Sequence, residues 1–132
     1  MSIAKLKASL REEVWRKLDE QRVATPRPSR GRIPIFVGSR VAAMKVLKKS
    51  FFQEAEVVYS TADLSLQPLR EEVLRAGKQL VMMIPSFRGF IIVNGGNLPR
   101  GTIPFAASPR GALAYGSQTL LLEGVGVDLV LV

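Results

Sequence analysis

The sequence predicts an α/β protein with a mostly parallel sheet. Three observations support this class: helical and strand-like segments alternate along the chain, the strand-like segments are short, and one of them is apolar without interruption. That segment, residues 80–84, reads Leu-Val-Met-Met-Ile, which is typical of a parallel strand buried on both faces. Alternation of this kind favours helices packed on a parallel sheet.

Apolar side chains at helical spacing predict three helices. The first begins after Ser2, which is suited to cap it, and should end by Ala24. Its expected core-facing stripe recurs every four residues, at Leu6, Leu10, Val14 and Leu18. The second helix begins at Ser39, and the third ends at Gly77. Residues 25–40 form a long basic connection, and connections of this length are typically functional or disordered.

Four segments have the composition of strands. They are residues 56–59, 80–84, 90–93 and 127–132. Residues 94–97, Asn-Gly-Gly-Asn, predict a turn. Residues 98–118 are rich in proline and glycine and are expected to be mostly loop, and residues 120–122 are expected to form a short element.

The composition limits the chemistry that this chain can perform. Its 132 residues predict one domain, 1–132. The sequence contains no cysteine and no histidine, which excludes disulfides, thiolate nucleophiles, imidazole bases and nearly all transition-metal sites. Neither a membrane-spanning run nor a signal peptide is evident, so we expect a cytoplasmic protein without membrane contact.

The positive charge is concentrated near the N-terminus. The net charge is +8, and residues 1–50 contain 13 Lys and Arg against 4 Asp and Glu, whereas residues 51–132 contain 6 against 7. This distribution predicts an anionic partner that contacts the N-terminal third, such as a nucleotide or a nucleic acid.

Six side chains are candidates for a binding site. Lys7 and Arg11 lie four residues apart on one face of the first helix, which suits a triphosphate but also a simple solvated face. Asp63 and Gln67 follow the first strand together with Arg70, at the position where α/β proteins bind ligands, although Asp63 is equally suited to cap a helix. The other two are Arg32, in the basic connection, and Arg88, after the second strand.

Taken in order, the motifs resemble those of the 5-formyltetrahydrofolate cyclo-ligase (methenyltetrahydrofolate synthetase) family, in particular its archaeal and domain-containing branch. The resemblance depends on six segments: Lys7-x-x-Leu10-Arg11-x-x-x-Trp15, Gly31-Arg32-Ile33-Pro34-x-Phe36-x-Gly38 with Ala42-Ala43, Asp63-x-x-x-Gln67-Pro68-x-Arg70, Gly77-Lys78-x-Leu80, Pro85-x-x-Arg88-Gly89-Phe90 and Val127-Asp128-Leu129-Val130. These segments cover nearly the whole chain.

The resemblance implies a three-layer α/β/α fold of the ribose-isomerase and CoA-transferase type. It also implies an ATP- and Mg²⁺-dependent enzyme that converts 5-formyltetrahydrofolate to 5,10-methenyltetrahydrofolate. ATP would phosphorylate the formyl oxygen, N10 would attack the activated carbon, and phosphate would leave.

By the same resemblance, Lys7 and Arg11 bind ATP, whereas the substrate is bound by Arg32, Asp63, Gln67 and Arg88. The resemblance assigns no catalytic residue and no metal ligand of this chain. In the family a glycine-rich loop follows the last strand, so a C-terminally truncated and inactive form is a further expectation.

Two alternatives do not require catalysis. In the first, the chain is a module that binds nucleotide or nucleic acid through its basic N-terminal third. In the second, another chain completes the sheet, because an open strand edge favours pairing.

Overall fold

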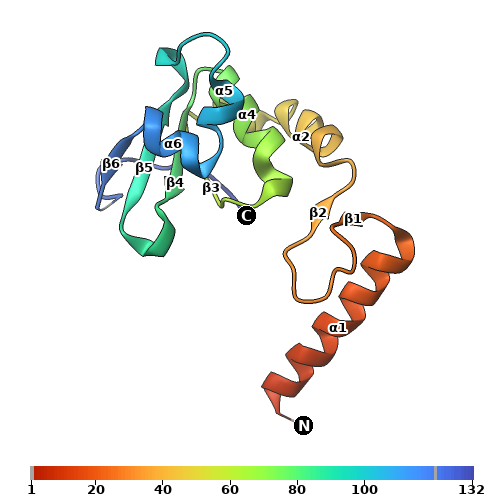
Figure 1. Cartoon of the computed structure of the whole chain (residues 1–132). Helices are drawn as coiled ribbons and strands as arrows, with labels where there is room; N and C mark the ends of the chain where they lie inside the picture. The colour runs from red at the N-terminus through yellow and green to blue at the C-terminus, as the bar shows by residue number, and fades with distance from the viewer. Residues whose placement is uncertain (1, 121) are drawn as a thin grey trace. The chain divides into compact units, whose positions relative to one another are not determined.

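The computed structural model describes residues 2–120 and 122–132, and the chain divides into two units, Met1–Ser39 and Arg40–Val132 (Figure 1). The first unit contains a long helix and a small hairpin, and the second contains the main sheet. Among the described residues, no helix is both long enough and apolar enough to cross a membrane. That the two units form one domain stays a prediction from the chain length.

Helix α1, Ile3–Gln21, forms as predicted. The side chain of Ser2 caps it by accepting a hydrogen bond from the Lys5 amide at 3.2 Å, and the left-handed backbone of Arg22 (φ 53°) ends it. The prediction that its apolar stripe faces a core was wrong for unit 1. Leu6, Leu10 and Val14 remain 47–62% exposed, because no element among the described residues of unit 1 covers this face.

The basic connection folds onto the end of α1. Strands β1 (Ala24–Thr25) and β2 (Ile35–Phe36) pair in antiparallel fashion. The Asp19 carboxylate accepts hydrogen bonds from the Ser29 amide at 3.0 Å and from the Ser29 hydroxyl at 2.7 Å. These bonds hold the pKa of Asp19 below its usual value and fix the long loop between the two strands.

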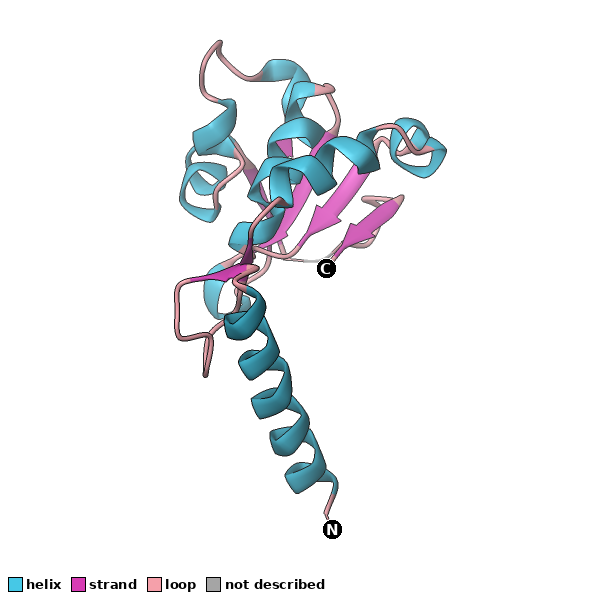
Figure 2. Cartoon of the chain, turned by 90° about the vertical axis from the view of Figure 1, so that its right-hand side faces the viewer, coloured by secondary structure: helices cyan, strands magenta, loops and turns pink. Residues whose placement is uncertain are grey.

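The second unit contains a five-stranded sheet with helices packed against it (Figure 2). The strand order is β6-β5-β4-β3-β7, with β3 parallel to β4 and β7, and with antiparallel β4–β5 and β5–β6 pairs. The strands are β3 (Val57–Ser60), β4 (Gln79–Met83), β5 (Phe90–Asn94), β6 (Ser117–Thr119) and β7 (Leu129–Leu131). The sheet is therefore mixed, and its arrangement confirms the α/β class and is consistent with a three-layer α/β/α fold.

The mixed pairing follows from the short connection between β4 and β5. Residues 84–89 connect the two strands and include the 3₁₀ turn η2, Pro85–Phe87. A connection this short joins antiparallel strands only. A parallel neighbour would need a crossover of a dozen or more residues. The parallel prediction is correct for β3, β4 and β7, which form the half of the sheet nearest the candidate site.

Short helices connect the strands. Residues 98–118, which were expected to be mostly loop, contain the helices α5 (Ile103–Ala106) and α6 (Pro109–Tyr115). Their prolines, Pro104 and Pro109, stand in the first turns, where proline is well tolerated. The expected second helix is divided in two. Besides α1 and η2, the helical segments among the described residues are α2 (Ser39–Leu47), α3 (Ser50–Glu54), η1 (Leu64–Leu66), α4 (Gln67–Arg75), η3 (Gly95–Asn97), α5 (Ile103–Ala106) and α6 (Pro109–Tyr115). The short element expected at residues 120–122 includes Leu121, which lies outside the described residues.

The core forms where the helices meet one face of the sheet. This face supplies Val58, Leu80, Met82, Ile91 and Val93, and the helices add apolar side chains from α4, α5 and α6. The central strand β4 is buried on both faces, as its apolar sequence predicted.

On the opposite face of the sheet, an aromatic pair covers the central strand. The rings of Tyr59 in β3 and Phe90 in β5 form an edge-on pair with centroids 6.4 Å apart. Because these two strands flank β4, the rings meet over it, and Val81 is 0% exposed.

Asp128 joins β7 to the start of β3. Its carboxylate accepts hydrogen bonds from the backbone amides of Glu56 at 2.9 Å and Val57 at 3.0 Å. These two bonds hold the pKa of Asp128 below its usual value. The interaction therefore stabilises the folded state only while the carboxyl group is ionised.

We expect Asp128→Asn to destabilise the protein at neutral pH and to have progressively less effect in acid. Because folding lowers this pKa, the stabilisation is complete above the ordinary carboxyl value of about 4 and is lost as the pH falls through the lowered value. Urea unfolding at a series of pH values measures the difference between variant and wild type. Glu123→Gln, at an exposed position, is the control. A difference that does not change with pH would contradict the assignment.

Candidate functional site

The carboxyl ends of three parallel strands form the edge of the sheet that holds the candidate site. Strand β3 has β4 on one side and β7 on the other, and ligands of open α/β sheets bind beyond such carboxyl ends, where the direction of the strand order changes. The chain leaves β3 through Thr61, whose hydroxyl donates to the Asp63 carboxylate at 2.9 Å. Predicted site residue Asp63 thus lies at this edge.

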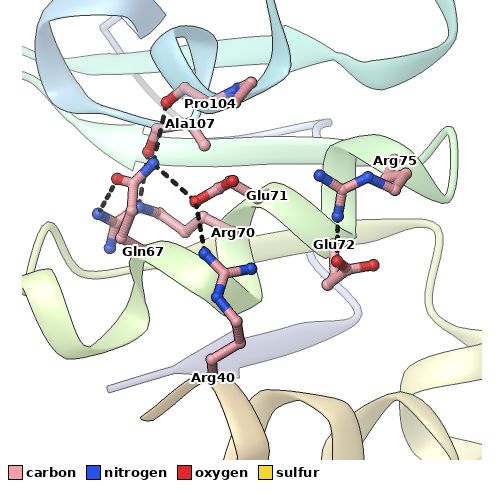
Figure 3. Close-up of polar contacts among 8 residues, drawn as sticks. All are labelled: Arg40, Gln67, Arg70, Glu71, Glu72, Arg75, Pro104 and Ala107. Carbon is pink, nitrogen blue, oxygen red and sulfur yellow. Dashed lines mark hydrogen bonds and ion pairs between the residues drawn. The ribbon is translucent and has the colours of Figure 1, made fainter. Parts of the chain in front are cut away.

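A buried arginine fixes the backbone of this edge (Figure 3). Arg70 in α4 is 0% exposed. Its Nη1 donates to the carbonyl oxygens of Thr61 at 2.8 Å and Asp63 at 2.9 Å, and its Nε donates to that of Ala107 at 2.7 Å. One guanidinium therefore joins the strand-end loop to the end of α5.

Arg70 remains charged at neutral pH despite its burial. Loss of solvent lowers its pKa to about 10, and this effect is opposed by the negative charges of Asp63 and Glu71. The hydrogen bonds to carbonyl and amide oxygens satisfy the guanidinium, which is the condition under which a charge is tolerated in a protein interior.

Predicted site residue Gln67 is held in the same cluster. Its Oε1 accepts from Arg70 Nη2 at 2.9 Å, and its Nε2 donates to the Pro104 carbonyl at 2.9 Å and to Glu71 Oε2 at 3.4 Å (Figure 3). Glu71 is 7% exposed, and the Arg40 guanidinium approaches its carboxylate at 3.9 Å. The amide of Gln67 therefore has partners within the protein at both of its ends.

Arg88 lies in the hairpin that follows the carboxyl end of β4. Because β3 and β4 are parallel, this hairpin and Asp63 share one edge of the sheet. The adjacent Gly89 has φ 121°, and a Cβ there would lie 2.7 Å from the Thr119 carbonyl oxygen, so only glycine fits. The local backbone thereby accounts for the glycine of the motif.

Lys7 and Arg11 share one face of α1, as their spacing predicted. They line a surface hollow of about 300 Å³ together with Leu10, Val14 and Trp15. The acidic side chains of the helix are engaged elsewhere: Glu12 pairs with Arg30, Glu13 with Lys17, and Glu20 with Arg16. Within the described part of the chain, Lys7 and Arg11 form no ion pair, so both cations can meet an external anion.

The six predicted site residues thus fall into groups. Lys7 and Arg11 lie together in unit 1, and Arg32 lies in the same unit on the exposed part of the connection. Asp63 and Gln67 are joined through Arg70, and Arg88 lies at the same edge of the sheet. Residues 2–120 and 122–132 contain no cluster of three acidic side chains that could hold a metal ion.

The sequence placed Arg70 beside Asp63 and Gln67 at the end of the first strand, but it did not show the structural role of this side chain. The signal for burial was present, since Arg70 lies three and four residues before the core residues Val73 and Leu74 and so on the same helix face. Its acceptors are mainly backbone carbonyls, which no side-chain pattern shows.

We expect Arg70→Met to lower the free energy of unfolding by about 3 kcal/mol or more, because three backbone carbonyls, of which that of Ala107 is buried, lose their donor. Arg75→Gln is the control on the same helix. Its exposed ion pair with Glu72 should contribute under about 1 kcal/mol. Urea unfolding measures both variants, and equal small losses would show that the Arg70 cluster does not stabilise the fold.

Three proteins named methenyltetrahydrofolate synthase domain-containing protein are similar to this chain. The Danio rerio protein is 31% identical over 131 residues, the Homo sapiens protein 30% over 130, and the Bos taurus protein 29% over 130. Each match covers 96% of this chain and 34% of the relative, so the chain spans about a third of the length of these proteins. No family model matches the chain, and no solved structure matches it.

The similarity covers 96% of the chain and so extends through both units. The chain is therefore homologous to a segment that makes up about a third of each methenyltetrahydrofolate synthase domain-containing protein. This homology supports a relationship to the cyclo-ligase family.

Proposed function

We propose that the chain forms part of a folate cyclo-ligase that uses MgATP to convert 5-formyltetrahydrofolate to 5,10-methenyltetrahydrofolate. The names of the similar proteins support the folate substrate, and the motif residues support the use of ATP. Phosphoryl transfer needs positioning and charge stabilisation rather than a nucleophilic side chain. A chain without cysteine or histidine is suited to such chemistry.

The observation that most favours this function is the pair of cations on α1. Lys7 and Arg11 are exposed, one helical turn apart and at the rim of the same hollow. A polyphosphate chain can contact both side chains at once, and an arginine and a lysine together provide several charge-assisted hydrogen bonds. In this proposal the two residues bind the phosphates of ATP and stabilise the charge that develops on transfer.

The edge of the sheet in unit 2 is the proposed folate side. The Asp63 carboxylate can accept hydrogen bonds from pterin N–H groups, and Arg88 can pair with a carboxylate of the folate tail. Gln67 then positions this edge rather than contacting substrate, because its amide already has three partners. Arg32, an exposed cation of unit 1, is a further candidate for an anionic part of the substrate.

Magnesium is compatible with this proposal although the described residues contain no acidic cluster. Mg²⁺ bound with a nucleotide takes most of its ligands from phosphate oxygens and water and needs only one or two protein carboxylates. The metal would supply charge neutralisation on the transferring phosphate.

We expect Lys7→Gln and Arg11→Gln each to weaken MgATP binding by about tenfold, because each removes a charge-assisted hydrogen bond. Binding of 5-formyltetrahydrofolate should be unchanged. Isothermal titration calorimetry measures both affinities. Arg16→Gln, which removes the same charge from the same helix, is the matched control. Wild-type affinity for MgATP in both variants would refute the assignment.

A second candidate function is the binding of nucleic acid by unit 1. Residues 1–39 contain 9 Lys and Arg against 4 Asp and Glu. Among the described residues, six of these cations form no ion pair, and one of the six, Arg27, donates to the backbone carbonyls of Ala24 and Arg22. The other five are Lys5, Lys7, Arg11, Arg22 and Arg32. Such a surface suits a phosphate backbone.

Salt dependence distinguishes the two candidates. A single-stranded oligonucleotide that contacts five cations should lose affinity with a slope of about −3.5 in a plot of log K against log salt concentration. Fluorescence anisotropy of a labelled oligonucleotide measures this slope. A weak or absent interaction at low salt, with MgATP binding intact, would leave the cyclo-ligase proposal alone.

A further inference from the structure

The two cations of the α1 hollow belong to a row that ends in an aromatic ring. Lys7, Arg11 and Trp15 recur every four residues. Each step of four advances by about 40° around the helix and about 6 Å along it. The three side chains therefore form one gently winding row, with about 12 Å between the Cα atoms of Lys7 and Trp15.

The row borders the exposed apolar stripe of α1 without being part of it. Leu10 and Val14 belong to the stripe and also line the hollow, whereas Lys7 and Arg11 line the hollow from beside the stripe. The hollow is thus positively charged toward the N-terminal end of the helix and apolar toward Trp15. A small inorganic anion would use only the first part.

A ligand that matches this arrangement has an anionic tail joined to a flat apolar group. We propose that the α1 hollow binds the whole nucleotide, with the base stacked on Trp15 and the phosphates on Lys7 and Arg11. This inference rests on the proposed function and adds which residue recognises the base. Its physical reasons are charge complementarity at one end and aromatic stacking at the other.

The same geometry predicts how selective the hollow is. Among the residues that line it, Lys7 and Arg11 serve the phosphates, and the only other polar side-chain group is the indole N–H of Trp15, which lies in the plane of the ring and is out of reach of a base stacked on its face. The base is then recognised by its ring face and not by hydrogen bonds to its edge. ATP and GTP should bind with similar affinity, pyrimidine nucleotides more weakly, and inorganic tripolyphosphate about tenfold more weakly than ATP.

The chain contains a single tryptophan, so its fluorescence reports directly on this residue. The experiment uses the full chain and titrates MgATP, MgGTP, MgUTP and magnesium tripolyphosphate, with correction for absorbance by the nucleotides. We expect the purine nucleotides to quench Trp15 emission. Tripolyphosphate should leave the emission unchanged and yet displace ATP at higher concentration.

Substitution of the ring separates stacking from charge. Trp15→Leu should weaken MgATP binding about tenfold by calorimetry and leave tripolyphosphate binding unchanged, whereas Trp15→Phe should restore most of the affinity. Circular dichroism confirms that α1 is intact in each variant. Ile3→Ala, an exposed apolar position of α1 outside the hollow, is the control and should have wild-type affinity.

The outcomes distinguish this inference from the function on which it rests. MgATP binding that is equal in wild type and Trp15→Leu, with no quenching in the wild type, would overturn the stacking assignment and leave the proposed function standing. Absence of any MgATP binding by calorimetry would overturn both. Quenching by purine nucleotides that Lys7→Gln and Arg11→Gln weaken would support both.

Discussion

The carboxyl edge of the sheet depends on the burial of one guanidinium. Arg70 donates to three backbone carbonyls that belong to separate segments, the loop after β3 and the end of α5. A buried cation is tolerated because its donors are satisfied, and in return it fixes carbonyl groups that would otherwise be costly to bury. The position of Asp63 relative to the strand ends is therefore a consequence of Arg70 in α4, nine residues after Thr61, and not of the loop sequence alone.

This constraint divides the polar residues of the edge into two kinds. Gln67 has its amide engaged by Arg70, Glu71 and the Pro104 carbonyl, so it belongs to the supporting framework. In the described part of the chain, the Asp63 carboxylate accepts from the Thr61 hydroxyl through Oδ2, and a carboxylate has further acceptor capacity that a ligand can use. A site of this kind presents a few unused groups on a framework whose other hydrogen bonds are satisfied, which limits reorganisation when the ligand binds.

The sequence predicted the elements whose signals are local. Helix α1 and its cap, the core strand β4 and the shared face of Lys7 and Arg11 all follow from spacing within one segment. Helices α5 and α6 were missed because their buried residues are small, Ala106, Ala107 and Ala112, and because their prolines indicated loop. The role of Arg70 could not be predicted, since its acceptor at Ala107 is 37 residues away in the sequence and is a backbone atom. Propensity and spacing do not show such contacts.

The two proposed binding regions, one in each unit, are prepared by different physical means. Lys7 and Arg11 are exposed side chains on a helix surface, so an anion that binds them must order two flexible side chains, which costs conformational entropy. Salt also screens the attraction between the anion and these cations. The edge around Asp63 is ordered before any ligand arrives, because buried hydrogen bonds hold it. Stacking on Trp15, beside the cations, offsets the entropy cost of ordering their side chains. The ring has few rotamers to lose, and stacking adds affinity that salt does not screen. In a surface hollow without a buried charge, the base of a nucleotide is therefore the part that can add affinity and distinguish a purine nucleotide from a bare polyphosphate.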